Sequence, residues 1–500
     1  MASWSNDLTR LSAQTRGILD RGGGLFIDGE VRQARSSLPV IDPSSNQAIS
    51  SIAAASAADI DAAVGAARAA LDNPAWRDIG PAGREAALHR LADAVAANAD
   101  VLAELESVDV GMPHWMSRNL DIGGTVDTLR YMAGWPTKIA GQTFDVSVPI
   151  PGSEFFGYTR REPVGVIGAI IPWNVPLMLA VWKLAPALAA GCTVVMKPSE
   201  EACLSVLELA RLAHQAGIPA GVFNVVTGTG REAGEALVAH PGIDKVTFTG
   251  STATGRRIAA KAAETTKKLT LELGGKSPQI LFADAELDEA VKGVADAIFL
   301  NSGQVCVAGS RLYVERRIHD AVVERLAAHA DALPLGAPLA EGTILGPLAS
   351  ARQHARVRAL LDTAIGAGAQ VATRQDPVAD VGNYLRPTIL SSVTNAMEIA
   401  REEVFGPVLT VTPFDDLDEA ATLANDTDYG LSACIWTSNL STAHRLVRRL
   451  TTGKVAVNTP PLPYPALPEG GRKASGYGRD LGEDAVAGFL ETKSLLIRLR

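Results

Sequence analysis

The chain has 500 residues, of which 47% are hydrophobic and 20% are charged, and its formal net charge is −9. This length exceeds what one hydrophobic core normally serves, so a globular chain of two or three domains is expected. The negative net charge argues against a nucleic-acid partner, because the phosphate backbone attracts basic surfaces.

The cysteine usage and the hydropathy pattern bear on the compartment. No stretch reaches the roughly 18 uninterrupted apolar residues that a membrane span requires. The N-terminus lacks the apolar segment of a signal peptide. Four cysteines occur at spacings that fit neither a disulfide framework nor a zinc site, namely Cys192, Cys203, Cys306 and Cys434. Free thiols persist in a reducing compartment, so the sequence predicts a cytoplasmic protein with no membrane partner.

The first third of the chain is mostly helical by pattern. Residues 1–50 are interpreted as an arm and a short pair of strands, and an alanine-rich region at 57–107 predicts helices. Pro74 and Pro81 mark breaks in this region. Asp59 is the predicted N-cap of its first helix, because a side-chain oxygen there can accept from the free N–H groups of the first turn.

From residue 164 the pattern changes to short apolar runs that alternate with helix-length segments. The predicted strands are residues 164–171, 193–196, 222–226, 245–248 and 268–273, followed in a second region by 311–314, 408–411, 432–436 and 455–458. Such alternation is typical of a parallel sheet covered by helices on both faces. We therefore expect an α/β protein with two doubly wound parallel-sheet domains, the first of them Rossmann-like in outline.

Two further segments are predicted to lie at the periphery. Residues 142–160 alternate loosely around a Pro-Gly turn, which predicts a long hairpin, and residues 492–498 predict a final strand. A sheet edge left bare invites pairing with another chain. We expect a small β element here that pairs with a partner strand.

The stretch NSGQVCVAGSR at residues 301–311 places Cys306 among small and apolar residues. Its glycines, Gly303 and Gly309, allow turns and a close approach of the backbone to a ligand. A thiol on such a turn can act as a nucleophile if another group activates it. The alternative is that Cys306 is a buried small hydrophobe, which is common for a free cysteine.

A second stretch upstream, LELGGKSP at residues 271–278, extends this pattern. Together the two stretches closely resemble the signature of the aldehyde dehydrogenase superfamily, and further blocks continue the match from about Arg161 to Gly478. Several separated motifs in the family's order are far more specific than one. The resemblance implies that the chain oxidises an aldehyde to the carboxylic acid with NAD(P), through a cysteine thiohemiacetal and a thioester that water hydrolyses.

The resemblance also implies three catalytic residues. Cys306 is the nucleophile, Glu272 is the base that activates water, and Asn174 in the block IPWNVP donates its side-chain amide to the aldehyde oxygen. Fixed donors aimed at a developing oxyanion lower an acyl-transfer barrier. The alternatives are a turn asparagine between two prolines and a strand-end glutamate that bonds nearby backbone. The chemistry requires no metal, and none of the eight histidines belongs to a ligand cluster.

The cofactor blocks are weaker when taken alone. FTGSTATG at residues 248–255 follows a predicted strand and opens a predicted helix, where free N–H groups can bind a pyrophosphate. Many glycine-serine turns only cap a helix, and the G-x-G-x-x-G fingerprint is missing, although TGTG at 227–230 lies nearby. The resemblance assigns Lys197 and Glu200 to the adenosine ribose. A carboxylate there repels an additional phosphate, so NAD is expected, with NADP as the alternative.

The block EEVFGPV at residues 402–408 resembles another family block. It implies that Glu403 binds the nicotinamide ribose and that Phe405 packs beside the ring, whereas paired glutamates elsewhere are usually a solvated face. The complete set of predicted cofactor contacts is Ile171, Pro172, Trp173, Lys197, Glu200, Gly230, Phe248, Thr249, Gly250, Ser251, Gly255, Leu273, Glu403 and Phe405.

Departures from the family pattern concern the substrate pocket. Glu469 stands where the family commonly has an aromatic residue before two glycines, and Val175 replaces a common phenylalanine. The pocket is expected to be apolar near the sulfur, with one carboxylate at its mouth. Its predicted residues are Val175, Leu179, Trp182, Val305, Val307 and Glu469. The proline-rich loop at 460–468 is unlike ordinary members.

The resemblance implies a domain division and an assembly. Residues 1–141 and 163–272 form the cofactor-binding domain and 273–474 the catalytic domain, while 142–162 and 489–500 are oligomerisation strands that build a sheet between subunits of a homodimer or homotetramer. Two other functions are considered. CoA-acylating relatives generally lack the base glutamate, which is present here as Glu272. A non-catalytic protein on the same scaffold would not need to retain Cys306, Glu272 and Asn174 together.

Overall fold

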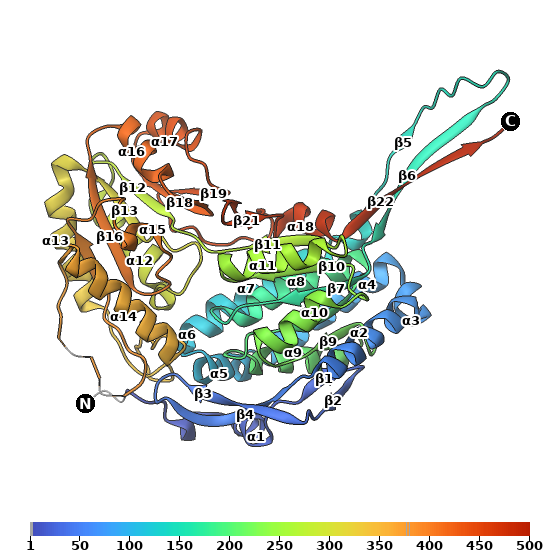
Figure 1. The fold of residues 1–500 in the computed structure, drawn as a ribbon, viewed down its shortest axis with the longest axis horizontal. Helices are drawn as coiled ribbons and strands as arrows, with labels where there is room; N and C mark the ends of the chain where they lie inside the picture. The colour runs from blue at the N-terminus through green and yellow to red at the C-terminus, as the bar shows by residue number, and fades with distance from the viewer. Residues whose placement is uncertain (1–3, 377, 380) are drawn as a thin grey trace.

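The structure is a computed structural model that describes residues 4–376, 378–379 and 381–500. Two α/β lobes lie side by side, and an arm of strands projects from the end of one lobe (Figure 1). The chain builds most of the lobe next to the arm first, crosses to the second lobe, and returns to the first lobe at its C-terminal end.

The first lobe is organised around a sheet that has eight strands within the described residues. In spatial order these are β2 (Glu30–Arg32), β1 (Leu25–Ile27), β9 (Phe223–Val225), β8 (Thr193–Lys197), β7 (Val166–Ile170), β10 (Lys245–Thr249), β11 (Lys268–Glu272) and β21 (Gly476–Tyr477). The run from β9 to β11 is parallel, and the outer strands are antiparallel. The order reverses between β7 and β10, so the carboxyl ends of these two strands flank the crevice where doubly wound sheets bind ligands.

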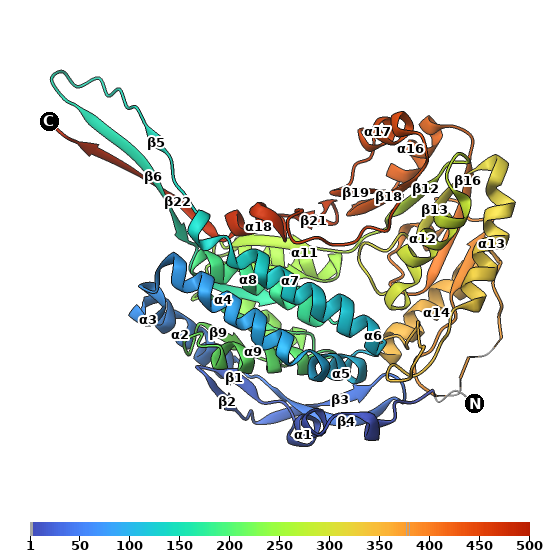
Figure 2. The same ribbon diagram turned by 180° about the vertical axis from the view of Figure 1, so that it is seen from behind.

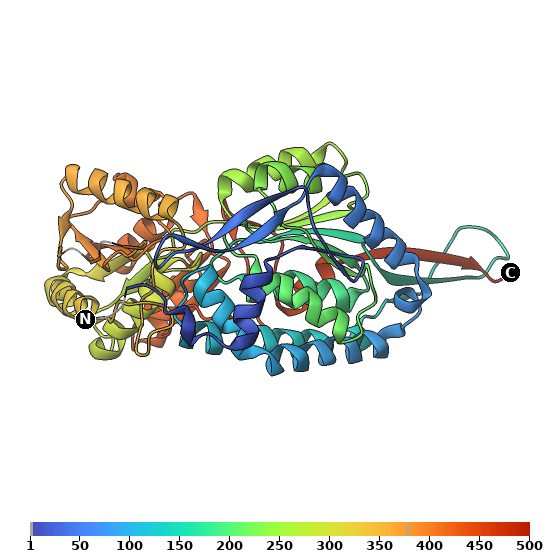
Figure 3. The same ribbon diagram turned by 90° about the horizontal axis from the view of Figure 1, so that it is seen from below.

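Helices cover both faces of this sheet, as the near-continuous apolar character of its strands requires. In the view from behind, α4 and α7 lie in front of the sheet (Figure 2), and the view from below separates them from α10 and α11 on the opposite face (Figure 3). The helices of this lobe are α1 (Ala13–Arg21), α2 (Ala57–Asp72), α3 (Pro74–Arg77), α4 (Gly80–Ala97), α5 (Ala99–Asp109), α6 (His114–Met116), α7 (Ile122–Ala133), α8 (Pro176–Ala190), α9 (Leu204–Gln215), α10 (Glu235–Ala239), α11 (Thr252–Ala263) and α18 (Gly482–Gly488).

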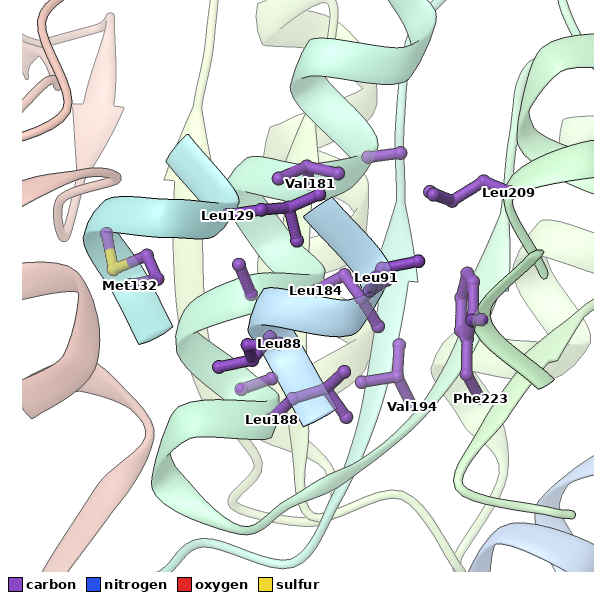
Figure 4. Packing of buried hydrophobic residues seen from close by; sticks show 14 of the residues in the cluster. Leu88, Leu91, Leu129, Met132, Val181, Leu184, Leu188, Val194, Leu209 and Phe223 are labelled. Carbon is purple, nitrogen blue, oxygen red and sulfur yellow. The ribbon is translucent and has the colours of Figure 1, made fainter. Parts of the chain in front are cut away.

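The largest core packs around α8. This helix begins at Pro176, whose fixed φ suits the first helical position, and ends before Gly191 in the left-handed conformation at φ 95°. It is apolar on nearly every side, which suits a helix buried all round. Figure 4 shows its side chains between two other helices and the sheet, through Leu88 and Leu91 of α4, Leu129 and Met132 of α7, Val181, Leu184 and Leu188 of α8, Val194 of β8 and Phe223 of β9.

The second lobe has a seven-stranded sheet within the described residues, and it is parallel except at β14. Its order is β14 (Gln370–Val371), β15 (Thr388–Ser391), β16 (Val408–Phe414), β13 (Arg311–Glu315), β12 (Pro278–Leu281), β18 (Ser432–Trp436) and β19 (Lys454–Val457). Its helices are α12 (Leu287–Phe299), α13 (His319–Ala332), α14 (Ala351–Gly366), α15 (Glu398–Arg401), α16 (Leu417–Asn425) and α17 (Leu440–Val447). The predicted strands are found in both lobes, whereas β12, β14, β15 and β21 were not predicted.

The strand pairing in the arm differs from the expectation that the hairpin and the C-terminal strand pair across subunits. β22 (Leu490–Arg498) pairs antiparallel with β6 (Phe155–Pro163) along its whole length, and β5 (Thr143–Phe144) pairs with the other edge of β6. The tail and the hairpin therefore pair with each other inside one chain rather than across subunits. The physical reason is proximity, because β22 follows α18 directly and emerges beside the base of β6.

Two smaller strand pairs complete the fold, β3 (Ser36–Asp42) with β4 (Gln47–Ala54) and β17 (Tyr429–Gly430) with β20 (Arg472–Lys473). The predicted N-cap of α2 is wrong. Ser56 caps this helix from an extended conformation and accepts from Asp59 N, while the Asp59 side chain accepts in return from Ser56 N in a capping box. No helix in the described part of the chain combines the length and the apolar character needed to cross a membrane.

Candidate active site

The loop that carries Cys306 connects α12 to β13 and has an unusual backbone. Asn301 and Ser302 adopt left-handed conformations with φ of 51° and 53°, and Gly303 follows with φ 73°. Such residues cost on the order of 1–3 kcal/mol each when they are not glycine. At Gly303 a Cβ would lie 2.1 Å from the carbonyl oxygen of Gly406, so only glycine fits there.

Hydrogen bonds from the same loop offset this strain. Ser302 Oγ donates to the carbonyl of Gly346 at 2.7 Å. The Gln304 side chain donates to the carbonyl of Asn301 at 3.2 Å and accepts from Ala349 N at 2.9 Å. Both side chains are buried. The polar residues that precede the cysteine therefore hold the backbone turn, and Cys306 is presented from a fixed loop.

Asn174 is tied to this loop by two reciprocal bonds. Its Nδ2 donates to the carbonyl of Gln304 at 2.9 Å, and Asn301 Nδ2 donates to the carbonyl of Asn174 at 2.8 Å. Asn174 lies just before α8 and is buried. A side-chain amide carries two N–H groups, so one remains for a ligand in the adjacent cavity.

Glu272 is the last residue of β11, where its carbonyl accepts from Gly250 N at 3.0 Å. Its side chain is 7% exposed, and its Oε1 has no hydrogen-bond partner among the described residues. Burial raises the pKa of this carboxyl well above its ordinary value, the neighbouring Asp480 raises it further, and Lys183 lowers it. A carboxyl with a raised pKa is suited to take up a proton near neutral pH.

These three residues line one cavity of about 370 Å³ at the junction of the two lobes. Cys306 is half-buried, whereas the other three cysteines are buried. Burial raises the pKa of the Cys306 thiol to about 12, with further contributions from Glu469, Glu403 and Glu272. The thiol is therefore protonated at neutral pH, and its use as a nucleophile requires a base.

All six predicted pocket residues line this cavity, namely Val175, Leu179, Trp182, Val305, Val307 and Glu469. The expected place of Glu469 at the mouth is wrong. The side chain is buried in the wall, where Oε2 accepts from Lys454 Nζ at 2.7 Å, because an ion pair with an internal lysine compensates the buried charge. Lys454 Nζ also donates to the carbonyl of Leu462 at 2.8 Å.

A second ion pair, between Lys183 of α8 and Asp480, is fully buried and also acts on the charge of Glu272. The backbone groups of Asp480 and Glu469 bond to each other at 2.7 and 2.8 Å, which joins the two ion pairs into one network. Lys454, Lys183 and Asp480 were not predicted. Only Lys183 had a signal in the sequence, as the one charged residue inside the apolar stretch that forms α8.

The predicted cofactor region forms a groove of about 800 Å³ beside the carboxyl end of β7. Glu200 and Gly230 line it, together with Thr229, Thr254 and Arg257, which were not predicted. Lys197 lies buried beside it, and its Nζ donates to the carbonyl of Pro198 at 2.8 Å and to Glu200 at 3.5 Å. The groove is therefore placed at the switch point of the sheet, as a dinucleotide requires.

Other predicted contacts lie between the groove and the cysteine. Thr249 and Leu273 line the active-site cavity, and Thr249 Oγ1 is buried without a partner among the described residues. Glu403 Oε1 accepts from Gly275 N at 3.0 Å, and burial raises its pKa to about 7. At Gly274 a Cβ would lie 2.3 Å from Glu403 Oε2, so the glycine allows this close approach.

Some predicted contacts line neither space. The Trp173 ring packs edge-on against Phe405 with centroids 5.2 Å apart, and Ser251 caps α11 by accepting from Thr254 N. Gly255 faces Leu273 and allows close packing of α11 on the sheet. The remaining members of this set are Ile171, Pro172, Lys197, Phe248, Gly250 and Glu403, of which Phe248 belongs to the core under the sheet.

This arrangement can carry out covalent chemistry at a carbonyl. A thiol, an amide donor and a carboxyl with a raised pKa meet at one apolar cavity, and a groove suited to a dinucleotide leads toward them. Among the described residues, no cluster of three or more histidine, cysteine, aspartate or glutamate side chains could hold a metal ion.

The fold and the site together define a nicotinamide-type α/β oxidoreductase with a cysteine at its centre, and the comparison with known proteins identifies the class. A sequence model of the aldehyde dehydrogenase family matches residues 31–495. The chain belongs to the aldehyde dehydrogenase family.

Several relatives match nearly the whole chain. The chain is 44% identical over 479 residues to a phenylacetaldehyde dehydrogenase of Pseudomonas fluorescens, covering 95% of each chain. It is 41% identical over 503 residues to aldehyde dehydrogenase 1A1 of Oryctolagus cuniculus, covering 100% of this chain and 99% of that one. The structure matches an NAD+ complex of aldehyde dehydrogenase from Bacillus cereus with a TM-score of 0.96 and 42% identity, covering 98% and 99% of the two chains. The predicted family, fold class and class of enzyme are confirmed.

Proposed function

We propose that this chain oxidises an aldehyde to the carboxylic acid with NAD and releases the acid by hydrolysis. The observation that carries this proposal is the meeting of Cys306, Asn174 and Glu272 at one cavity, although they come from three separate segments. The family membership supports the class of reaction. The roles of the individual residues are derived from their chemistry and surroundings.

The first step is addition of Cys306 Sγ to the aldehyde carbon. The thiol must lose its proton, and Glu272 is a carboxyl in the same cavity with a free Oε1 that can accept it directly or through a water molecule. Negative charge then develops on the former aldehyde oxygen. The second N–H of Asn174, whose first is bonded to Gln304, is held in position to stabilise this oxygen.

The residues present fit a nicotinamide dinucleotide. Glu200 and Lys197 would hold the adenosine ribose, the groove at Gly230 and Thr254 would take the pyrophosphate side, and Glu403 would bind the second ribose. When bound, NAD supplies the hydride acceptor that the oxidation requires. Glu200 lines the groove, and its carboxylate would repel a 2′-phosphate, so we propose a preference for NAD over NADP.

Hydrolysis uses Glu272 a second time, after its carboxyl has released the thiol proton to solvent. The acyl group is held on Cys306 Sγ as a thioester. Glu272 takes a proton from a water molecule while the oxygen of that water attacks the acyl carbon. The C–S bond breaks, the thiolate leaves, and the carboxylic acid is released. Because Glu272 lines the same cavity as Cys306, hydrolysis is favoured over transfer to CoA.

Three further expectations remain proposals. We propose residues 1–141 and 163–272 as the cofactor-binding domain and 273–474 as the catalytic domain, and the strand β21 and helix α18 extend the first of these. A homodimer or homotetramer is proposed through the oligomerisation strands, 142–162 and 489–500. A cytoplasmic location is proposed because the four cysteines are free thiols.

The test follows NADH absorbance with the purified protein, starting with phenylacetaldehyde, the aldehyde named for the Pseudomonas fluorescens relative. We expect the carboxylic acid as product, higher kcat/KM with NAD than with NADP, and no dependence on CoA. Cys306→Ser should abolish turnover, because an alkoxide is much harder to form than a thiolate. Cys434→Ala, a substitution in the core strand β18, serves as the control. Comparable turnover of Cys306→Ser would refute the proposal, and an acyl-CoA product would replace hydrolysis by the acylating reaction.

A further inference from the structure

The charged side chains that line the active-site cavity are all acidic. Six carboxyl residues line it, and none of the lining residues that the structure describes is a lysine or an arginine. These carboxyl residues are Asp121, Asp127, Glu272, Asp296, Glu469 and Asp480. Acidic residues occur at the exposed end of the cavity, as with Asp127, and beside the sulfur, as with Glu272 and Glu469.

Three cations lie near these carboxyl groups, and none of them lines the cavity. Arg479, whose charge acts on Glu272 and Glu469, donates from Nη1 to the carbonyl of Gly471 at 3.0 Å. Lys183 lies behind the wall and is bound to Asp480. Lys454 is 13% exposed in its side chain, and its Nζ is bound to Glu469 Oε2 and to the carbonyl of Leu462. Each of these cations is thus bonded to the protein, and none of them faces the cavity in which an anionic substrate would have to bind.

Glu469 has one carboxylate oxygen in the ion pair and one outside it. While Oε2 is bound to Lys454, its Oε1 is buried and has no hydrogen-bond partner among the described residues. This residue stands where the aromatic residue of the family pattern was expected. The same lysine bonds the 460–463 segment of the cavity wall through Leu462, so the pair sets both the charge and the shape of this wall.

Apart from Asn119, Asn174 and Thr249, the rest of the wall is largely apolar. Met112, Met116, Met178, Leu179, Trp182 and Leu462 line it. Methionine side chains are flexible and polarisable, so such a wall accommodates apolar bodies of different shapes. A charged group placed among them would lose its hydration without gaining a partner.

We propose that the active site selects neutral aldehydes with an apolar body and rejects aldehydes that carry a carboxylate or a phosphate, and that the Glu469–Lys454 pair is a determinant of this selection. The proposal rests on the proposed oxidation of aldehydes and adds the class of substrate. Two like charges within several ångströms of each other at an effective dielectric of about 20 repel strongly enough to lower affinity by more than tenfold. Removing the Glu469 charge would also free Lys454 to face the substrate.

The experiment compares 3-(4-methylphenyl)propanal with 3-(4-carboxyphenyl)propanal. The two aldehydes have nearly the same shape, and two methylene groups insulate the reacting carbonyl from the ring substituent. For the wild-type enzyme we expect kcat/KM to be at least about 30-fold lower for the carboxylate, mainly through KM. The selectivity ratio is kcat/KM for the methyl compound divided by kcat/KM for the carboxylate. In Glu469→Gln this ratio should fall at least about fivefold, whereas in Lys454→Gln it should rise. Glu341→Gln, which removes the same charge from an exposed position, is the matched control and should leave the ratio unchanged.

The outcomes separate the two proposals. General damage to the fold would lower kcat/KM for both aldehydes and would not move the ratio in opposite directions in the two variants. Equal kcat/KM for the two aldehydes in the wild type, or a ratio that Glu469→Gln leaves unchanged, would overturn the proposed selection while aldehyde oxidation stands. If the wild type oxidises neither of the two substituted propanals nor phenylacetaldehyde, the proposed function and the proposed selection are both overturned.

Discussion

The reactivity of the site is decided by a few buried side chains whose charges are coupled. Cys306 is flanked by carboxylates that oppose its ionisation, so its thiol stays protonated until a base acts. Glu272 lies within the electrostatic influence of both ion pairs, and its Oε1 has no hydrogen-bond partner among the described residues. The same carboxyl can therefore serve the addition of the thiol and the later attack of water.

Substitution of Glu272 separates these two uses. In Glu272→Gln the shape is kept and the proton acceptor is lost, so deacylation should slow by about 10²–10⁴-fold, or roughly 3–5 kcal/mol in activation free energy. We expect a rapid-mix trace with one NADH per active site, followed by a stalled phase. Mass spectrometry of the denatured protein at intervals should find the acyl group on the peptide that contains Cys306.

Normal steady turnover of Glu272→Gln would contradict this prediction and would leave Glu272 with a structural role at the end of β11. Another group of the cavity would then have to activate the water. Some slowing of acylation is compatible with the proposal, because Glu272 also accepts the thiol proton.

At the scale of elements, the N-terminus of α8 positions Asn174. This helix has no side-chain cap of its own. Instead, Leu177 N donates to Glu106 Oε1 at 3.2 Å and Met178 N donates to Asp121 Oδ1 at 2.6 Å. Two carboxyl groups from other elements thus satisfy free N–H groups of the first turn, three and four residues after Asn174.

This buried pair makes stability depend on pH. Burial raises the pKa of Asp121 to about 7, and burial together with Asp121 raises the pKa of Glu106 well above its ordinary value. A carboxyl with a raised folded pKa binds its proton more tightly in the folded state. Its contribution to stability is therefore complete below the unfolded pKa, near pH 4, and is lost as the pH rises through about 7.

Asp121→Asn should remove part of this dependence while keeping an acceptor for Met178 N. Between pH 5 and pH 8 we expect the wild type to lose on the order of 1–2 kcal/mol of unfolding free energy relative to the variant. Thermal denaturation across this pH range measures the difference. Asp127→Asn, at an exposed position of α7 further along the chain, should follow the wild-type curve. Parallel curves for wild type and Asp121→Asn would contradict this account.

At the scale of the whole molecule, the arm projects away from both lobes (Figure 1). β22 pairs with β6 on one side, and its other edge has no strand partner within the described residues. Its exposed apolar residues include Leu496 and Ile497, which are 58% and 41% exposed. A long strand edge of this kind favours pairing with another chain.

We therefore expect a native mass of at least twice the 52.3 kDa of one chain, measured by light scattering after size exclusion. Leu496→Glu should shift the population toward smaller species, because it places a charge in the apolar surface of the arm. Leu440→Glu, at an exposed apolar residue of α17 far from the arm, should leave the mass unchanged. A monomeric mass for the wild type would contradict the proposed assembly.

Local sequence was sufficient for most strands and for the reactive residues. Residues 193–196 and 432–436 were recognisable because buried parallel strands are short continuous apolar runs, and β8 and β18 lie there. Cys306, Glu272 and Asn174 were recognisable because each lies in a contiguous motif. β12 and β15 were missed because a proline opens or precedes each of them, Pro278 in β12 and Pro387 just before β15, and a proline argues against a central strand.

The tertiary structure alone decided which charges meet. Lys183 and Asp480 are 297 positions apart. Lys454 opens β19, and Glu469 lies 15 positions further on, outside any helix or strand, so no local pattern relates either pair. The same holds for the carboxyl groups that hold α8 and for the pairing of β22 with β6. Local backbone preference and hydrophobic periodicity act over a few residues. Ion pairs and sheet partners depend on the path of the whole chain, and here that path places two lysines behind an acidic cavity wall.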